Sequence, residues 1–78
     1  MIRFRLTELI SDMGFNKDRR ITLEEISSAT GIHRTTLSKI ANQRGYNTTT
    51  DNLDKLCLFF NCPIEKLMEH VPDMSAHE

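Results

Sequence analysis

The sequence has no tryptophan, one tyrosine, two cysteines, two prolines and three glycines among its 78 residues. Its apolar residues are mostly Leu, Ile, Met and Phe. Val and Tyr are rare, and Thr does not occur in the alternating pattern that sheets prefer. This composition favours an all-α fold. A chain this short buries only about 60–65% of its unfolded surface, which leaves room for one domain of four or five short helices and no deep catalytic cleft.

Long apolar runs and catalytic motifs are also missing. No run approaches the ~20 apolar residues that cross a bilayer, and the first five residues lack a signal-peptide core. The chain is therefore expected to be cytoplasmic, with no membrane partner. It contains no carboxylate pair, Ser/His/Asp set or phosphate-binding glycine loop, so we expect neither enzyme activity nor a cofactor.

The two cysteines, Cys57 and Cys62, are five residues apart. A zinc site would need both of them together with His70 and His77, and the cysteine spacing is longer than structural zinc sites use. We expect instead two small buried apolar side chains in a reducing compartment, with no metal site and no disulfide.

The net charge of −1 argues against a nucleic-acid partner, but its distribution reverses that conclusion. Residues 1–50 carry eight Lys and Arg against five Asp and Glu, whereas residues 51–78 carry two against six. No acidic residue occurs between Glu25 and Asp51, and this window contains three cations, Arg34, Lys39 and Arg44. The pattern predicts a locally positive surface that can face phosphates.

The most informative segment is residues 21–41, ITLEEISSATGIHRTTLSKIA, which predicts two short helices separated by a turn at Gly31. Thr22 and Glu25 have the spacing at which each side chain bonds the other's backbone N–H at a helix start. Two apolar residues, Ile21 and Ile26, flank this cap at the hydrophobic-staple positions.

The same arrangement recurs at the second helix, where Ile32 and Leu37 flank His33. Two helix starts of matched design, joined by one glycine, are typical of a helix-turn-helix unit. Such a unit usually places its second helix in the major groove of DNA.

Other helices follow from apolar spacing. The first is expected from Leu6 to Met13, ended by Gly14 with Phe15 packing back against it. The second turns Ile26 and Ala29 inward, and the fourth runs from about residue 51 to 60. A fifth opens at Pro63 and ends at Pro72. We expect a single domain over residues 1–73 and a flexible tail over residues 74–78.

The chain start alternates apolar and charged residues, with Ile2, Phe4 and Leu6 separated by arginines. This alternation predicts a short strand, which would pair with the segment around Val71 or with the same strand of a second subunit. Fraying of the N-terminus is the alternative.

Two segments, ITLEEISSATGIHRTTLSKI and LDKLCLFFNCPIEKLMEHVPD, resemble the Cro/repressor-like (XRE family) helix-turn-helix regulators of bacteria and phages. The resemblance covers roughly residues 2–73. It implies a five-helix, lambda-repressor-like DNA-binding domain. It also implies a transcriptional regulator, expected to be a repressor, that inserts its third helix (about residues 34–41) in the major groove. Two residues depart from the family pattern: Ser27 replaces the usual Ala, and His33 replaces the usual Ser or Thr cap.

Carried onto this sequence, the resemblance places Arg34, Thr35 and Lys39 on the outward face of the third helix. Arginine suits the guanine O6 and N7 acceptors, and the threonine methyl suits the thymine methyl. Residues at the start of the second helix, and residues in the loop after the third helix, are expected to hold phosphates. The expected DNA-binding residues are Thr22, His33, Arg34, Thr35, Thr36, Ser38, Lys39, Arg44 and Tyr46.

The expected partners are double-stranded operator DNA and a second copy of the chain. One such domain buries only about 600–1,000 Å² on DNA, and a two-fold dimer is the usual remedy for the weak specificity that results. Candidate dimer surfaces are Leu58 with Phe59, and Ile2 with Phe4. The alternative function is an antitoxin or adaptor whose helical bundle mainly binds a partner protein through its acidic C-terminal half.

Overall fold

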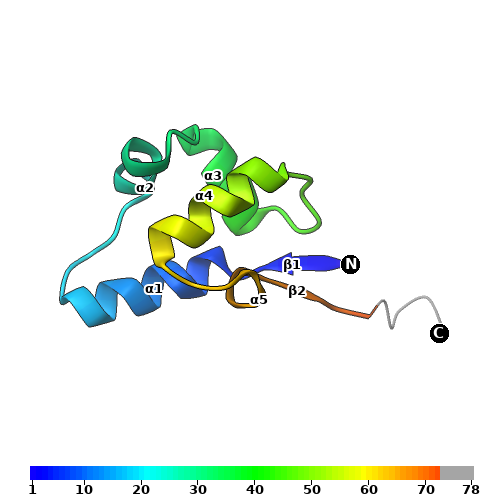
Figure 1. Cartoon of the computed structure of the whole chain (residues 1–78), viewed down its shortest axis with the longest axis horizontal. Helices are drawn as coiled ribbons and strands as arrows, with labels where there is room; N and C mark the ends of the chain where they lie inside the picture. The colour runs from blue at the N-terminus through cyan, green and yellow to red at the C-terminus, as the bar shows by residue number, and fades with distance from the viewer. Residues whose placement is uncertain (73–78) are drawn as a thin grey trace.

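A computed structural model describes residues 1–72 of the chain (Figure 1). Within that range the structure is mostly helical, with five helices and a two-stranded sheet, as the sequence predicts. The flexible tail expected at residues 74–78 lies outside the described residues. In chain order the elements are β1 (Ile2–Phe4), α1 (Leu6–Lys17), α2 (Leu23–Thr30), α3 (Arg34–Asn42), α4 (Thr50–Phe60), α5 (Ile64–Leu67) and β2 (Met68–His70).

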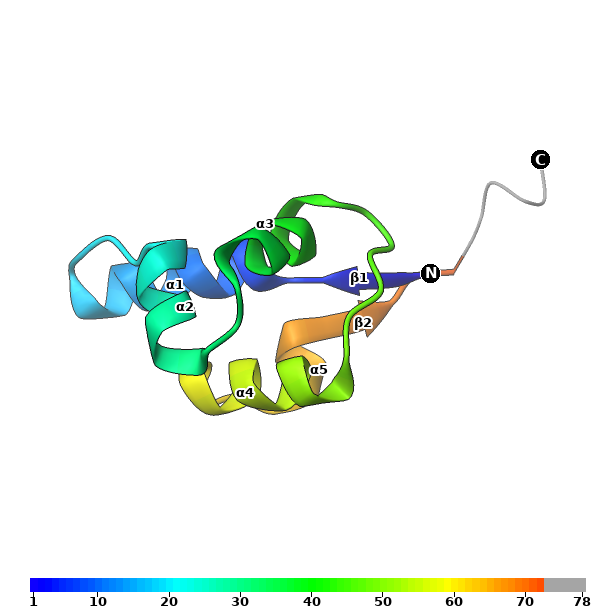
Figure 2. The ribbon, with the colours of Figure 1, turned by 90° about the horizontal axis from the view of Figure 1, so that it is seen from above.

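The strand predicted at the chain start is confirmed, and it pairs within the same chain. β1 and β2 are antiparallel, with Arg3 opposite Glu69. The two strands lie side by side and extend away from the helices (Figure 2). Two further backbone bonds prolong the pairing, from Arg5 N–H to the Leu67 carbonyl (2.6 Å) and from Val71 N–H to the Met1 carbonyl (2.8 Å).

One carboxylate ties the two strands together through its side chain. Glu69 accepts hydrogen bonds from Arg3 at 2.7 Å and from Arg5 at 2.5 Å. Arg3 also donates to Glu8 at 2.9 Å, which joins the sheet to the first turn of α1. The two arginines at the chain start are thus paired with acids on two elements. Arg3 binds Glu8 on α1, and both Arg3 and Arg5 bind Glu69 on β2, more than sixty residues away in the sequence.

The core is entirely apolar and draws on all five helices and the connections between them. No polar or charged residue is buried in residues 1–72. The inward positions of α1, α3, α4 and α5 follow the apolar spacing of the sequence. The buried residues are Leu6, Ile21, Ile26, Ile32, Leu37, Ile40, Leu53, Leu56 and Leu67.

The first helix is longer than predicted. It continues through Gly14 to Lys17 and ends at Asp18, which takes the left-handed conformation with φ 55°. Phe15 is 87% exposed, so the prediction that it packs back under the helix end is wrong. Gly14 serves a different purpose: a Cβ there would lie 2.9 Å from the Arg19 carbonyl, where the chain folds back over the helix.

The last helix is shorter than predicted. α5 is a single turn that ends at Leu67, and Met68 already belongs to β2, so Pro72 does not end the helix. Although Met68 has the spacing of an inward helix residue, it pairs with Phe4 of β1 as part of a strand. On α2, Ala29 is exposed rather than inward, and the core side of that helix consists of buried Ile26 and half-buried Leu23.

No helix within residues 1–72 is long and apolar enough to cross a membrane.

The Glu69 cluster is expected to make the fold sensitive to acid. Hydrogen bonds from Arg5 and Arg3 lower the pKa of Glu69 below its ordinary value of 4.5. A carboxyl group whose pKa is lowered by folding stabilises the folded state above its unfolded pKa, and this contribution is lost as the pH falls through the folded pKa. The free energy of unfolding in urea should therefore drop below about pH 4.5, and Glu69→Gln should show a smaller drop.

Glu65→Gln is the matched control, since Glu65 is exposed and forms no ion pair within the described part of the chain. That variant should keep the acid dependence of the wild type. Identical pH profiles for the wild type and Glu69→Gln would show that the cluster contributes nothing to stability.

Candidate nucleic-acid interface

The start of α2 is held by the predicted threonine cap. The Thr22 hydroxyl accepts a hydrogen bond from the Glu25 N–H at 3.1 Å, and Thr22 has extended backbone angles. Ile21 and Ile26 are both buried on either side of this cap, as the staple predicts. Thr22 is exposed, so its side of the helix N-terminus is open to solvent.

The second half of the predicted capping box is replaced by an ion pair. The Glu25 carboxylate accepts two hydrogen bonds from the Arg19 guanidinium, at 2.8 and 2.7 Å. Hydrogen bonding to Arg19 lowers the pKa of Glu25. The connector before α2 is therefore fixed by a bidentate pair that helix-start spacing alone does not indicate.

The turn between α2 and α3 uses Gly31 as the sequence predicts. Gly31 has φ 79°, and its N–H donates to the Ser27 carbonyl at 2.8 Å. Thr30 completes the turn: its hydroxyl donates to the Ile26 carbonyl at 2.7 Å and accepts from the Ile32 N–H at 3.1 Å. Ile32 is buried, which fixes the direction in which α3 leaves the turn.

α3 has one buried face and one exposed face. Leu37 and Ile40 are buried, while the expected DNA-binding residues are exposed or half-buried. His33 precedes the helix without forming a side-chain cap, as its departure from the family pattern suggests. The exposed members are His33, Arg34, Thr35 and Lys39, and the half-buried ones are Thr36 and Ser38.

The start of α2 and the first two turns of α3 meet around a surface hollow of about 550 Å³. The hollow brings together four of the expected site residues, Thr22, Arg34, Thr35 and Ser38, which come from two separate segments. Its lining also includes Glu24, an acid that the expected site did not contain. Glu24 lies just outside the acid-free window, and it lines the hollow only because α2 and α3 meet there, so no spacing within one helix identifies it.

Lys39 lies one turn further along α3, beside the loop that follows the helix. Its ammonium nitrogen is 6.0 Å from the centre of the Tyr46 ring, within the range of a cation–π contact. Tyr46 is half-buried and packs against the core, so it can restrain the lysine side chain. Tyr46 is thus a support for Lys39 as well as a loop residue.

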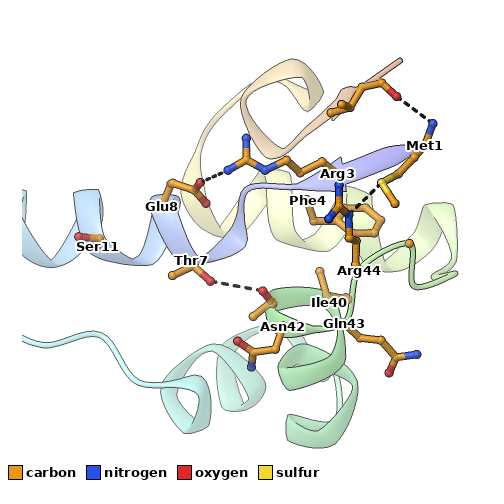
Figure 3. Close-up of a pocket in the computed structure, with 13 residues that line it drawn as sticks. Met1, Arg3, Phe4, Thr7, Glu8, Ser11, Ile40, Asn42, Gln43 and Arg44 are labelled. Atoms are coloured by element: carbon orange, nitrogen blue, oxygen red, sulfur yellow. Dashed lines mark hydrogen bonds and ion pairs between the residues drawn. The ribbon is translucent and has the colours of Figure 1, made fainter. Parts of the chain in front are cut away.

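Arg44 is set apart from the hollow and faces the chain start. Its Nε lies 3.3 Å from the Met1 sulfur, across a groove of about 720 Å³ between β1, the start of α1 and the end of α3 (Figure 3). In the same groove, the Thr7 hydroxyl of α1 donates a hydrogen bond of 3.5 Å to the Ala41 carbonyl of α3 (Figure 3). Of the expected site residues, four thus line the α2–α3 hollow and Arg44 lines a second groove, while His33, Thr36, Lys39 and Tyr46 line neither.

Ion pairs divide the cations of the domain into two groups. Arg3, Arg5 and Arg19 are each bound to a carboxylate. The cations of the acid-free window, Arg34, Lys39 and Arg44, form no ion pair in residues 1–72, and we call them the unneutralised cations. Outside the window Lys55 pairs with Asp51, whereas Lys17, Arg20 and Lys66 form no ion pair in the same range.

The two cysteines are free and half-buried rather than fully buried. No group of three or more His, Cys, Asp or Glu side chains suited to a metal ion occurs in the part of the chain that the structure describes. His77, one of the four residues that a zinc site would need, lies outside that part.

A capped helix, a glycine turn and a second helix with unneutralised cations on its outer face define a helix-turn-helix DNA-binding domain. The chain belongs to the Cro/C1-type HTH DNA-binding domain family, whose model matches residues 5–73. The resemblance seen in the sequence is thus confirmed, and DNA binding is the function of the family. Comparison with curated proteins finds no match to this chain.

The turn predicts a specific response to substitution at Gly31. A Cβ there would have nothing within 4 Å, so only the left-handed backbone conformation opposes a side chain. Gly31→Ala should lower the free energy of unfolding by about 1–2 kcal/mol, and Gly31→Asn should lower it by less because asparagine tolerates this conformation. Urea denaturation of both variants measures the difference. An equal loss for Ala and Asn would mean that the left-handed conformation is not what limits this position.

Proposed function

We propose that the chain is a sequence-specific transcriptional repressor that occupies an operator by inserting α3 in the major groove. One observation carries the proposal: the outer face of α3 bears Arg34, Thr35 and Lys39, while its inner face is locked in the core by Leu37 and Ile40. A rigid helix with unneutralised cations and hydroxyls on one side has the width and the donors that the major groove accepts.

Within the α2–α3 hollow, Glu24 and the residues of α3 take the base-reading role. Arg34 donates to the O6 and N7 of a guanine, and the Thr35 methyl packs against a thymine methyl. His33, Thr36 and Ser38 line the same helix surface. Glu24 adds an acceptor beside Arg34, which suits the amino group of a cytosine and opposes a phosphate.

The remaining residues take the role of positioning the DNA backbone. Thr22 and the first amides of α2 offer donors at a helix N-terminus, where a phosphate is stabilised. Lys39 reaches a base or a phosphate from its place over the Tyr46 ring. Arg44 and the Tyr46 hydroxyl bind the DNA backbone on the opposite side of the major groove, without contacting base edges.

We also propose that the protein binds DNA as a homodimer, with the two α3 helices about 34 Å apart. The candidate dimer surfaces differ in how free they are. Leu58 is 74% exposed and Ile2 is 38% exposed, whereas Phe4 and Phe59 are half-buried against the core. Exposed apolar side chains favour association, so the surface around Leu58 at the end of α4 is the stronger candidate.

Selection of bound sequences from a random DNA pool tests the function directly. A palindromic site with half-sites one helical turn apart is the expected outcome, with the mass of the complex showing two copies of the chain. If no sequence is enriched and the chain instead retains a basic partner protein, the antitoxin or adaptor function replaces this proposal.

Substitutions on α3 test the assigned face. Arg34→Ala should weaken binding to the selected site by about 1–3 kcal/mol and relax the preference at one base pair. Lys39→Ala and Arg44→Ala should weaken binding to all sequences alike and flatten its salt dependence. Binding is measured by fluorescence anisotropy over a range of salt concentrations.

The matched control is Lys66→Ala, which removes an exposed cation from α5. It should leave affinity for the selected site unchanged. If Arg34→Ala and Lys39→Ala both bind that site like the wild type at ~150 mM salt, where electrostatic contacts still count, α3 is not the DNA-reading helix.

A further inference from the structure

The end of α4 brings the two cysteines together through its backbone. Asn61 takes the left-handed conformation with φ 53°, and its N–H donates to the Leu58 carbonyl at 3.2 Å. The Cys62 N–H donates to the Cys57 carbonyl at 3.0 Å. This pair of bonds is the Schellman motif, in which the side chains at the positions of Cys57 and Cys62 usually make an apolar contact. Here both positions carry thiols.

The same hydrogen bond limits how far apart the two cysteines can lie. The Cys62 nitrogen is one bond from its Cα and the Cys57 oxygen is two bonds from its own, so the Cα atoms cannot be more than about 7 Å apart. Disulfides span Cα separations of about 4.4–6.8 Å. The pair is therefore placed to close a disulfide without refolding of the helix end.

In a single copy of the chain, solvent reaches the pair through a shallow hollow of about 340 Å³, whose Leu58 also belongs to the proposed dimer surface. Its lining comes from the last turns of α4 and the turn after it, and includes both cysteines, Asp54 and Leu58. None of the lining residues belongs to α2 or α3, so this hollow is separate from the helix-turn-helix surface.

We propose that Cys57 and Cys62 form a thiol–disulfide exchange site, which takes a small neutral or cationic disulfide and closes to an intramolecular disulfide. The inference does not depend on which DNA sequence, if any, the domain reads. It also differs from a permanent structural disulfide, because exchange with small thiols reopens the bond.

The exchange proceeds in two displacements. The Cys62 thiolate, after losing its proton to solvent, attacks one sulfur of the small disulfide, forms a mixed disulfide and releases one small thiolate. Cys57 then loses its proton and attacks the Cys62 sulfur of the mixed disulfide, which releases the second small thiolate. The protein loses two protons and two electrons, and the small disulfide is reduced to two thiols.

The order of the two steps follows from the surroundings of Cys57. Burial raises the pKa of the Cys57 thiol, and the nearby Cys62, Asp54 and Glu65 raise it further. A raised pKa leaves less of Cys57 as thiolate, so Cys62 is proposed as the first attacking group. The carboxylates of Asp54 and Glu65 also repel anionic reagents, which is why the site favours a neutral or cationic disulfide.

The test treats the full chain with cystamine, a cationic disulfide, and follows the products by mass spectrometry. The wild type should become a monomer lighter by two hydrogen atoms. Cys57→Ser should stop at a mixed disulfide on Cys62, and Cys62→Ser should form its mixed disulfide on Cys57 more slowly than Cys57→Ser forms its own. Glutathione disulfide, which is anionic, should react more slowly than cystamine, with the gap narrowing at high salt.

Substitution of Asn61 separates helix-end geometry from mere possession of two thiols. Asn61→Gly keeps the left-handed conformation and should close the disulfide as readily as the wild type. Asn61→Val opposes that conformation and should lower the closed fraction at a fixed ratio of small disulfide to small thiol. If the wild type yields only mixed or intermolecular disulfides, the proposal is wrong, and equal closure in both Asn61 variants overturns the role of the helix end.

Discussion

A shared apolar core holds every helix of this domain in place. Its helices have four to twelve residues, and helices of that length are marginal in water on their own. α3 depends on the core because His33 gives its first turn no side-chain cap, and α1 and α5 also begin without one. Leu37 and Ile40, buried to 0% and 2% exposure, fix its position instead. The directions of the outward side chains are thus set by the apolar residues beneath them.

The acids of the domain decide which of its arginines stay free. Glu69 and Glu25 together neutralise three guanidinium groups, those of Arg3, Arg5 and Arg19, and they do so in pairs that also close the sheet and the connector before α2. Arg34 and Arg44 receive no such partner within the described chain. A chain with a net charge of −1 can therefore present a positive surface, because its ion pairs concentrate the remaining charge.

Local signals predicted most of this arrangement, and contacts with other elements or connectors, at short and at long sequence separation, account for what they missed. The Thr22 cap, the Gly31 turn and the inward pair Leu37 and Ile40 each follow from residues within one helical turn. Glu25 binds Arg19 instead of the helix start, and Met68 joins β1 instead of α5. Gly14 is required because a side chain there would clash with the carbonyl of Arg19, five residues further along the chain. Glu24 entered the hollow because two helices meet there, which spacing along one helix does not reveal.

The pairing of β1 with β2 also has a mechanical consequence. Because the strands are antiparallel, Met1 and Val71 lie at the same end of the sheet, joined by hydrogen bonds of 3.0 and 2.8 Å. Tension applied between these two residues acts on the hydrogen bonds nearest to them first. The hydrogen bonds between the strands therefore break one pair after another, instead of all at once. The sheet would yield first under load, while α2 and α3 remain packed on their core.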